Sequence, residues 1–499
     1  MREGEGETPE IMEKEIAIPD TVLGVMNQLS DAGFEAYVVG GCVRDSLMGR
    51  VPADWDVTTN AKPEDVIYLF PETHYQNVFG TVSVKTGSEE PSEAIVEITT
   101  YRMDGVYSDA RHPDYVEYSE RLEDDLSRRD FTMNAIASDG KVIIDPHNGQ
   151  EDIEAKQIRA VGDPNERFSE DALRLMRAVR FATQLEFTIE DKTAAAISEQ
   201  SEMLSKIALE RSQDEFVKLL MSPRGDMGVE LMRKHGLMKH VLPELLEGVG
   251  MEQNHHHIYT VWEHNVRALR YACEQGYSMQ VRLASLLHDV GKARTKDEKG
   301  RDSTFYGHEA VGGRMVKKML KRLRFPREDV EHISMLVTQH MFNSDVEGEN
   351  AITEAGARRL VSRVGAENLD DLFRVREADR IGSGVPKAVP FRLRKFKYLV
   401  DRAMHDPISR KQLKINGNDL IGELAMEPGP RLGSVIDALF EEVLDDPKNN
   451  TKEDLLARAK ELGALSDEDL QKLRESAQAK YDAVLAADDE QLKSKHRVS

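Results

Sequence analysis

The amino-acid sequence predicts an α+β protein in which a mixed α/β head is followed by all-helical domains. Its 499 residues correspond to about three domains, at roughly 150 residues per domain. Apolar runs with strand-like spacing occur between about residues 30 and 160. Beyond Arg167 the apolar positions recur with helical periodicity nearly to the C-terminus, interrupted by prolines and glycines. We therefore expect the sheet in the first third of the chain and helices in the rest.

The elements of the head can be placed in order along the chain. The glycine pair Gly40-Gly41 lies between an apolar run and a helical pattern, which is typical of a strand, a turn and a helix. The pair is compatible with a simple tight turn, and also with a loop whose backbone N–H groups approach phosphates at a helix N-terminus. The expected elements are a helix over 18–32, a strand over 36–39, a helix over 43–48, and strands over 81–84, 95–99 and 141–144.

The charge balance limits the kinds of partner. The chain has 67 Lys and Arg residues against 90 Asp and Glu residues, a formal net charge of −23. This balance excludes a protein that coats nucleic acid through overall positive charge. It leaves room for a local basic surface, because electrostatic steering depends on where charge lies. With 40% apolar residues, the chain can bury sizeable cores and is not a disordered or fibrous protein.

Cysteine content and hydropathy indicate the compartment. The two cysteines, Cys42 and Cys273, lie far apart in the sequence, and so low a count is typical of a reducing compartment. No run approaches the roughly 18 apolar residues that span a bilayer. The Glu-rich N-terminus lacks the apolar core of a secretory signal. We expect a cytoplasmic protein with no membrane partner.

A set of carboxylates forms the first candidate site. In Asp54-Trp55-Asp56, residues i and i+2 of a strand point to one side, so the two carboxylates would face the same way. Like charges so close repel unless a divalent cation lies between them, and hard oxygen ligands suit Mg²⁺. Glu97, inside the predicted strand 95–99, is either a third acid of this site or a solvent-facing strand residue.

Arginines follow in two further motifs. Arg44, Arg128 and Arg129 are candidates to neutralise phosphate charge, because guanidinium groups match phosphate geometry. Arg129 and the adjacent Asp130 are also compatible with a buried structural ion pair.

Downstream, the spacing of Glu170-Asp171-x-x-Arg174 predicts that all three side chains lie on one face of a helix. An ordinary salt bridge on a helix surface is the simplest interpretation of that spacing.

Joined together, these motifs resemble the polymerase-beta-like nucleotidyltransferase superfamily, and more closely the bacterial class II CCA-adding enzymes, which are tRNA nucleotidyltransferases. The run from Arg128 to Ala135 resembles the RRDFTxNA motif of that family, and residues 170–174 resemble its EDxxR motif. Glu210-Arg211 and Glu215 resemble its last neck motif. The resemblance covers about residues 30 to 460.

The resemblance implies template-independent addition of C, C and A to tRNA 3′ ends, with tRNA, CTP and ATP as partners and Mg²⁺ as cofactor. Asp171 and Arg174 would read the base edge, because cytosine and adenine carry an exocyclic amine and uracil does not. The implied catalytic residues are Asp54, Asp56 and Glu97, of which Asp54 and Asp56 bind Mg²⁺. The implied nucleotide-binding residues are Gly40, Gly41, Arg44, Arg128, Arg129, Asp130, Asn134, Glu170, Asp171, Arg174 and Arg177.

Histidines and aspartates form a second candidate site. A single histidine on a helix is usually a packed or surface residue. Here, however, an ordered set with His288-Asp289 at its centre resembles the HD phosphohydrolase superfamily. That resemblance implies a divalent metal of unknown identity and attack of activated water on a phosphoester, although a structural, inactive domain stays open. The candidate ligands are His264, His288, Asp289 and Asp379, with His308 and His340 for a second ion or for phosphate contacts.

Two basic runs are candidates for contact with the tRNA backbone. The first covers 314–327 and contains no acid, and the second comprises Arg392, Arg394, Lys395 and Lys397. Each run is compatible with a solvated helix face, or with phosphate contacts that need cations but read no bases. We favour the second run as the tRNA contact.

The motifs predict the domain order and leave alternative functions open. The expected parts are a mobile acidic segment over 1–17, a nucleotidyltransferase head over 18–163, a helical neck over 164–250, an HD domain over 251–385 and a helical tRNA-binding body over 386–499. Alternatives in the same class are a poly(A) polymerase and an enzyme that adds only CC or only A. An alternative from another class is an HD phosphohydrolase with a vestigial head. No protein partner is evident.

Overall fold

The computed structural model describes residues 15–75, 80–105, 116–253, 258–297, 303–342, 354–405, 413–445, 447–466, 468–472 and 496–497. Most of the predicted acidic segment 1–17 therefore lies outside the described residues. The chain divides into two compact units. The first consists of Met1–His340 with Arg374–Val385, and the second of Met341–Phe373 with Pro386–Ser499. The predicted boundaries of the head, neck and HD domain inside the first unit stay predictions.

A mixed seven-stranded sheet organises the head, with strand order β3-β4-β5-β2-β1-β8-β9. Its central strands β2 and β5 run parallel, and the other pairs are antiparallel. The strands of this sheet are β1 Ala36–Val39, β2 Trp55–Thr59, β3 Thr73–Tyr75, β4 Thr81–Lys85, β5 Ile95–Thr100, β8 Ala137–Ser138 and β9 Ile143–Ile144. Two short pairs lie apart from it: β6 Arg102–Asp104 with β7 Val116–Tyr118, and β10 Gln157–Ile158 with β11 Thr188–Ile189.

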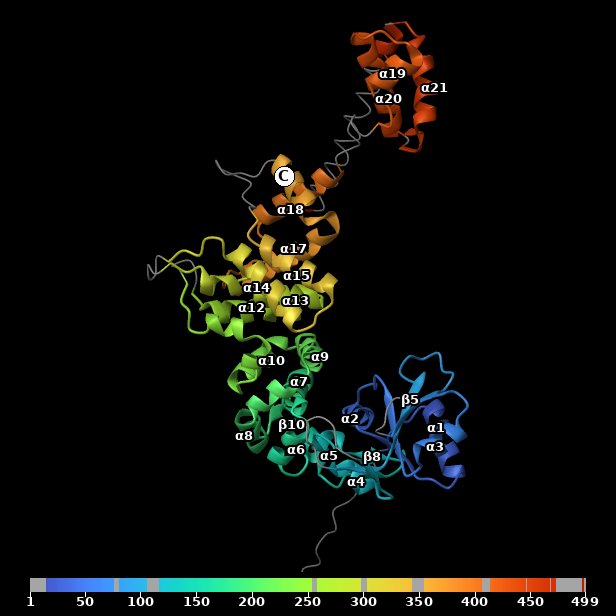
Figure 1. Cartoon of the computed structure of the whole chain (residues 1–499), viewed down its shortest axis with the longest axis vertical. Helices are drawn as coiled ribbons and strands as arrows, with labels where there is room; N and C mark the ends of the chain where they lie inside the picture. The colour runs from blue at the N-terminus through green and yellow to red at the C-terminus, as the bar shows by residue number, and fades with distance from the viewer. Residues whose placement is uncertain are drawn as a thin grey trace, which may run out of the picture. The chain divides into compact units, whose positions relative to one another are not determined.

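Helices α1 (Asp20–Asp31) and α3 (Pro63–Leu69) pack against the sheet and against each other (Figure 1). Helix α1 buries Val22, Met26 and Leu29, whose i, i+4, i+7 spacing places them on one face. The strands contribute alternate apolar residues to the same core, including Val38 and Val57. The remaining helices of the head are α2 Gly41–Leu47, α4 Leu122–Ser127 and α5 Gly149–Glu154.

Most predicted elements of the head are confirmed. The helix predicted over 18–32 is α1, the strand over 36–39 is β1, and the strands over 81–84 and 95–99 are each one residue longer in the structure. The helix predicted over 43–48 instead begins at Gly41, because Gly40, with φ +83°, makes the turn by itself.

The strand predicted over 141–144 is wrong in its first half. The Asp139 carboxylate accepts hydrogen bonds from the backbone N–H groups of Lys141 and Val142, which closes a turn there. Only Ile143–Ile144 pairs in the sheet.

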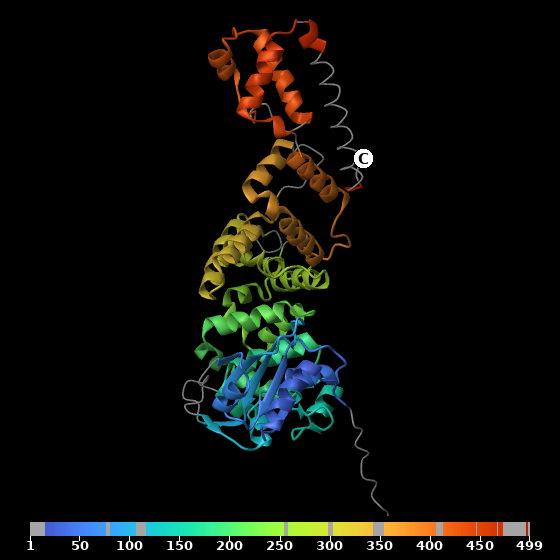
Figure 2. The ribbon, with the colours of Figure 1, turned by 90° about the vertical axis from the view of Figure 1, so that its right-hand side faces the viewer.

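After the sheet, the first unit is helical, as the green and yellow segments in Figure 2 show. This confirms the predicted fold class. Its helices are α6 Pro164–Glu170, α7 Leu173–Leu185, α8 Asp191–Glu199, α9 Leu209–Leu220, α10 Gly225–Lys234, α11 Met238–Val241, α12 Val261–Glu274, α13 Met279–Leu287, α14 His308–Arg322 and α15 Arg327–Gln339, with the C-terminal part of α17 Leu369–Gly382.

The second unit is also helical where it is described. Helices α16 (Glu354–Val364) and α18 (Phe391–His405) pack together, and Phe342 stacks on Phe396 with ring centroids 5.2 Å apart. A separate apolar core unites α19 Gly417–Leu424, α20 Pro430–Asp445 and α21 Lys452–Gly463. Among the residues with a described position, none of the helices combines the length and apolar composition needed to cross a bilayer.

Candidate functional site

Two carboxylates of the head lie side by side on neighbouring strands of the sheet. Asp56 on β2 and Glu97 on β5 are direct register partners in the parallel pair. Burial, with the negative charges of Asp54 and Glu97, raises the pKa of Asp56 to about 7, while Arg129 opposes this rise. Asp54 was expected on the same strand, but β2 begins at Trp55, so Asp54 lies in the bend just before it. The three acids nevertheless act on one another, and a divalent cation would relieve their repulsion.

The glycine pair brings an arginine close to these acids. Gly40 has φ +83°, and a Cβ atom there would lie only 2.9 Å from a guanidinium nitrogen of Arg129. A side chain at this position would therefore displace Arg129. Gly41 is the first residue of α2. The tight-turn interpretation is thus confirmed, and a phosphate-binding role for the backbone stays a prediction.

A chain of polar side chains connects the head to helix α7. Arg44 donates to Asn134 (2.8 Å), and Asn134 donates to Asp130 (3.1 Å). Arg177 on α7 then donates to the other carboxylate oxygen of Asp130 at 2.8 Å. Although burial alone would raise the pKa of Asp130, the charges of Arg177 and Arg174 lower it to about 2. The alternative interpretation, an Arg129–Asp130 ion pair, is not what the structure has, because Asp130 bonds to Arg177 and Asn134.

Arg129 and Arg128 share a different partner, Asp125. The buried Asp125 carboxylate accepts hydrogen bonds from both guanidinium groups. The sequence prediction did not include Asp125. Its i, i+3 and i, i+4 spacing to the two arginines was the available signal.

The prediction that Glu170, Asp171 and Arg174 share one helix face is wrong. Helix α6 ends at Glu170, and Asp171 adopts an extended conformation (φ −136°, ψ 103°) before α7 begins. The Asp171 carboxylate accepts a hydrogen bond from the backbone N–H of Leu173, which favours a helix start over a continuous helix. Arg174 still donates to Glu170 at 2.6 Å.

Asp171 is paired instead with Arg211 on α9. The two Arg211 nitrogens lie 2.9 and 3.3 Å from the two carboxylate oxygens. Arg174 donates to the backbone oxygen of Arg128 at 3.0 Å, which joins α7 to the head. Arg211 belongs to the sequence motif that resembles the last neck motif, but it was not among the predicted site residues.

These groups surround one cavity of about 330 Å³. Carboxylates and arginines both line its wall, and two of the carboxylates, Asp130 and Asp171, are paired with the arginines Arg177 and Arg211. Its lining residues are Val39, Asp56, Glu97, Thr99, Arg128, Arg129, Asp130, Asp171, Leu173, Arg174, Arg177 and Arg211. The site thus brings together Asp56 and Glu97 from the sheet with Asp171, Arg174 and Arg177 from the helices. Such a cavity can receive a polyphosphate beside a cation and a base beside polar side chains.

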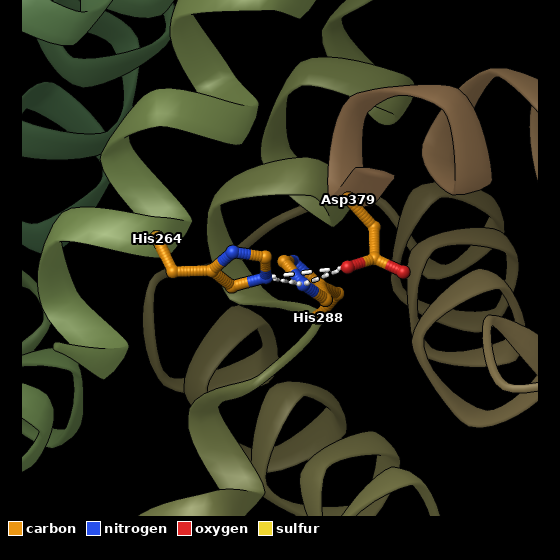
Figure 3. A group of neighbouring side chains, drawn as sticks. All are labelled: His264, His288 and Asp379. Carbon is orange, nitrogen blue, oxygen red and sulfur yellow. Dashed lines mark hydrogen bonds and ion pairs between the residues drawn. The ribbon is translucent and has the colours of Figure 1, made fainter. Parts of the chain in front are cut away.

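The second cluster lies among helices α12, α13 and α17. Figure 3 shows His264, His288 and Asp379 pointing toward one another from separate segments. The Nε2 atoms of His264 and His288 are 2.8 Å apart, and one Asp379 oxygen lies 3.3 and 3.6 Å from them. Both histidines are fully buried. Three ligand atoms this close, in a buried place, suit a shared cation.

A second group of three adjoins the first through Asp289. One Asp289 oxygen lies 3.3 Å from His264 Nε2. The other lies 3.2 Å from His308 Nε2 and 3.7 Å from His340 Nε2. This approach requires Gly291, where a Cβ would lie 2.1 Å from the backbone oxygen of His308. Asp289 can therefore bridge two cation positions.

The histidine rings are oriented by the backbone. The Nδ1 atoms of His288, His308 and His340 lie 2.6 to 2.8 Å from the backbone oxygens of residues 285, 305 and 337. Bonding at Nδ1 leaves Nε2 for a metal, as in most metal-binding histidines. Without a metal, burial would lower the pKa of His288, but Asp289 and Asp379 raise it to about 10. The donor set fits a divalent metal.

Comparison with known proteins identifies the family. The model described as "Poly A polymerase head domain" matches residues 36–159, "Probable RNA and SrmB- binding site of polymerase A" matches 186–248, and "HD domain" matches 261–382. The CCA-adding enzyme of Ligilactobacillus salivarius is 31% identical over 462 residues, which cover 89% of this chain and 98% of that protein. The chain belongs to the CCA-adding enzyme family.

Two further relatives and one solved structure are also similar to this chain. The enzyme of Lactobacillus helveticus is 47% identical over 220 residues, which span 43% of this chain and 54% of that protein. An A-adding tRNA nucleotidyltransferase of Deinococcus radiodurans is 34% identical over 421 residues, 81% of this chain and 91% of that protein. The crystal structure of the Bacillus stearothermophilus CCA-adding enzyme in complex with CTP superposes with a TM-score of 0.56 at 28% identity, covering 89% of this chain and 98% of that one.

The favoured tRNA contacts of this CCA-adding enzyme family member lie on α18, in the second unit. Arg392 is exposed, whereas Arg394, Lys395 and Lys397 are half-buried. The Lys397 ammonium lies 5.0 Å from the ring centroid of Phe373, so part of its charge is used within the unit. Contact with tRNA stays a prediction for all four.

Proposed function

We propose that this chain adds the CCA sequence to tRNA 3′ ends, with CTP and ATP as substrates. The observation that carries the proposal is the single cavity that joins Asp56 and Glu97 to Asp171 and Arg174. Membership of the CCA-adding enzyme family and the similarity to an enzyme crystallised with CTP support it. Because tRNA and nucleoside triphosphates are the proposed substrates, we place the protein in the cytoplasm.

The carboxylates Asp54, Asp56 and Glu97 would hold Mg²⁺. Burial, together with the negative charges of Asp54 and Glu97, raises the pKa of Asp56, and a hard dication is the natural counter-charge for such an oxygen set. Bound Mg²⁺ supplies charge stabilisation to both the attacking and the leaving oxygen in nucleotidyl transfer. Asp56 and Glu97, fixed opposite each other by the strand register, set where the reacting phosphate lies.

Arginines bind the rest of the triphosphate. Arg128 and Arg129 line the cavity with Asp56, and their guanidinium forks match phosphate oxygens. Asp130, held between Asn134 and Arg177, presents a carboxylate that remains ionised at neutral pH. Such a carboxylate accepts hydrogen bonds from ribose hydroxyls.

Asp171 and Arg174 select the base. A carboxylate accepts from the exocyclic amine of cytosine or adenine, whereas the carbonyl of uracil offers it no donor. Arg211 fixes Asp171 from one side, so that carboxylate cannot turn away from the base. Arg174 is fixed in turn by Glu170 and the Arg128 backbone.

Nucleotide addition provides the direct test. The protein is incubated with Mg²⁺ and tRNA that ends at the discriminator base, with each NTP singly and then together, and the 3′ ends are sequenced. CTP alone should give CC, and CTP with ATP should give CCA. Long A tails would instead indicate a poly(A) polymerase, and a stop after CC would indicate a partial enzyme.

One relative favours a second candidate of the same class. The similarity to an A-adding tRNA nucleotidyltransferase extends over 81% of this chain. In the same assay, an A-adding enzyme would leave tRNA without CC unchanged and would extend only tRNA that already ends in CC.

We also propose that the HD cluster is a metal-dependent phosphohydrolase site. All six predicted ligands lie in two adjoining groups, which supports an active domain over a structural one. A divalent metal held by these ligands would supply the activation of water for attack on a phosphoester. Hydrolysis of bis(p-nitrophenyl) phosphate by EDTA-treated protein, with Mg²⁺, Mn²⁺ or Ni²⁺ restored singly, tests this and identifies the metal. Absence of hydrolysis and of metal binding with every ion would contradict it.

A further inference from the structure

Asp125, on helix α4, is a fully buried carboxylate outside the set of groups assigned so far. It accepts from Nε and a terminal nitrogen of Arg128 at 3.0 and 2.5 Å, and from Arg129 at 3.2 Å. The hydroxyl of Thr58 donates to it at 3.2 Å. A carboxylate removed from water is tolerated only when it is paired in this way.

These contacts tie two cavity arginines to the strand that carries the catalytic carboxylate. Thr58 lies on β2, two residues after Asp56, and β2 is a central strand of the sheet. Arg128 and Arg129 follow the end of α4 and have half-buried side chains that also line the cavity. Each guanidinium has five N–H donors in a planar fork, which is more than the bonds to Asp125 use.

The alternative partner of Arg129 is Asp56 itself. Both residues line the same cavity, so a mobile Arg129 would be attracted to the carboxylates that the cation needs. The Asp125 carboxylate competes with Asp56 for Arg129. It thereby limits neutralisation of Asp56 by Arg129.

We infer that Asp125 is a positioning residue that fixes Arg128 and Arg129 against strand β2, so that their guanidinium groups, which line the cavity, receive the nucleotide phosphates. This inference rests on the proposed nucleotidyl transfer. It adds a residue that contacts no substrate and acts through the two arginines.

The test is Asp125→Asn, compared with Glu123→Gln, which removes the same charge from an exposed position on the same helix. Asp125→Asn should raise KM for both CTP and ATP by about tenfold or more, with kcat changed by less than about threefold. Glu123→Gln should leave both constants unchanged. A fall in kcat without a change in KM would mean a purely structural role and would overturn the inference.

Thr58→Val keeps the carboxylate and the arginines and removes the hydrogen bond from strand β2 to Asp125, together with the bond from the same hydroxyl to the backbone oxygen of Thr99. It therefore decides the matter if Asp125→Asn does not fold. It should raise KM about threefold, since the hydrogen bond that anchors Asp125 to the strand is lost. An unchanged KM in folded Thr58→Val, with melting temperature as the check, would overturn the anchoring to β2. Failure of the proposed function is separate, because the wild-type protein would then add no nucleotide at all.

Discussion

Asp56 and Glu97 lie opposite each other on the parallel strands β2 and β5, although 41 positions separate them in the sequence. Register pairs on one face of a sheet have neighbouring side chains, so two carboxylates in this relationship repel unless a cation is present. Burial is the main cause of the raised pKa of Asp56, and the negative charge of Glu97 adds to it.

Asp56→Asn should abolish nucleotide addition and leave HD hydrolysis intact. Loss of a ligand at the catalytic cation is expected to cost about 4 kcal/mol of transition-state stabilisation, about a thousandfold in rate. The melting temperature should not fall, because the change removes a repelled charge. Both reactions are measured on the same preparation, and loss of both would contradict two independent sites.

Arg211→Gln should weaken base selection more than it slows the reaction. Without Arg211, Asp171 loses the guanidinium that fixes both of its oxygens. Discrimination of CTP and ATP against UTP, measured as the ratio of kcat/KM, should fall by about tenfold or more. Glu210→Gln, at the exposed neighbouring position, is the matched control. An equal loss for all nucleotides would speak against a selecting role.

Removal and return of metal ions should show that both activities depend on a divalent cation. EDTA treatment should stop both, and Mg²⁺ at millimolar concentration should restore nucleotide addition.

Because Asp289 faces both groups of ligands, Asp289→Ala should lose every HD metal, whereas His340→Ala should retain one. Metal content per chain after dialysis measures this, and equal losses in the two variants would contradict a bridging carboxylate.

The Cys42 thiol should be unreactive in the folded protein and should gain reactivity only at high pH. Burial raises the pKa of Cys42 to about 12. At pH 8 the thiolate fraction is then about a thousandfold lower than for an ordinary thiol of pKa 9.0. Alkylation followed by mass spectrometry should show the rate still rising above pH 9. A plateau near pH 9 would show that the thiol is accessible to water.

The two basic runs can be separated by salt dependence. If α18 contacts tRNA phosphates, Arg392→Gln with Lys395→Gln should weaken tRNA binding and reduce the slope of log K against log salt by about 0.7 to 0.9 per lost contact. Arg314→Gln with Lys318→Gln, at exposed positions of α14, is the matched comparison. A larger effect of this second pair would assign the contact to the first run.

Several features could be predicted because they depend on neighbouring residues alone. The strands over 36–39 and 95–99 follow from apolar spacing, and helix α1 follows from its 3.6-residue period. Local spacing was misleading at Asp171. The side chain of Asp171 bonds to the backbone of Leu173 and starts a new helix, a tendency of aspartate that the i, i+3 count ignores.

The partners of charged groups could not be predicted in the same way. Asp171 bonds to Arg211, 40 residues away. In place of the alternative Arg129–Asp130 pair, Arg129 bonds to Asp125 and Asp130 bonds to Arg177. Ion pairs depend on distance in space and on burial, and neither is present in the order of residues.

The amino-acid sequence alone determined the fold class, the kinds of ligand and the two separate sets of chemistry, because residue type and short spacing specify donors, acceptors and element periods. Tertiary structure decided which of these residues lie next to one another. Strand register placed Glu97 beside Asp56, and close helix packing at Gly291 placed Asp289 between two groups of histidines. These contacts follow from the burial of apolar faces, which packs segments that are distant in the sequence against one another.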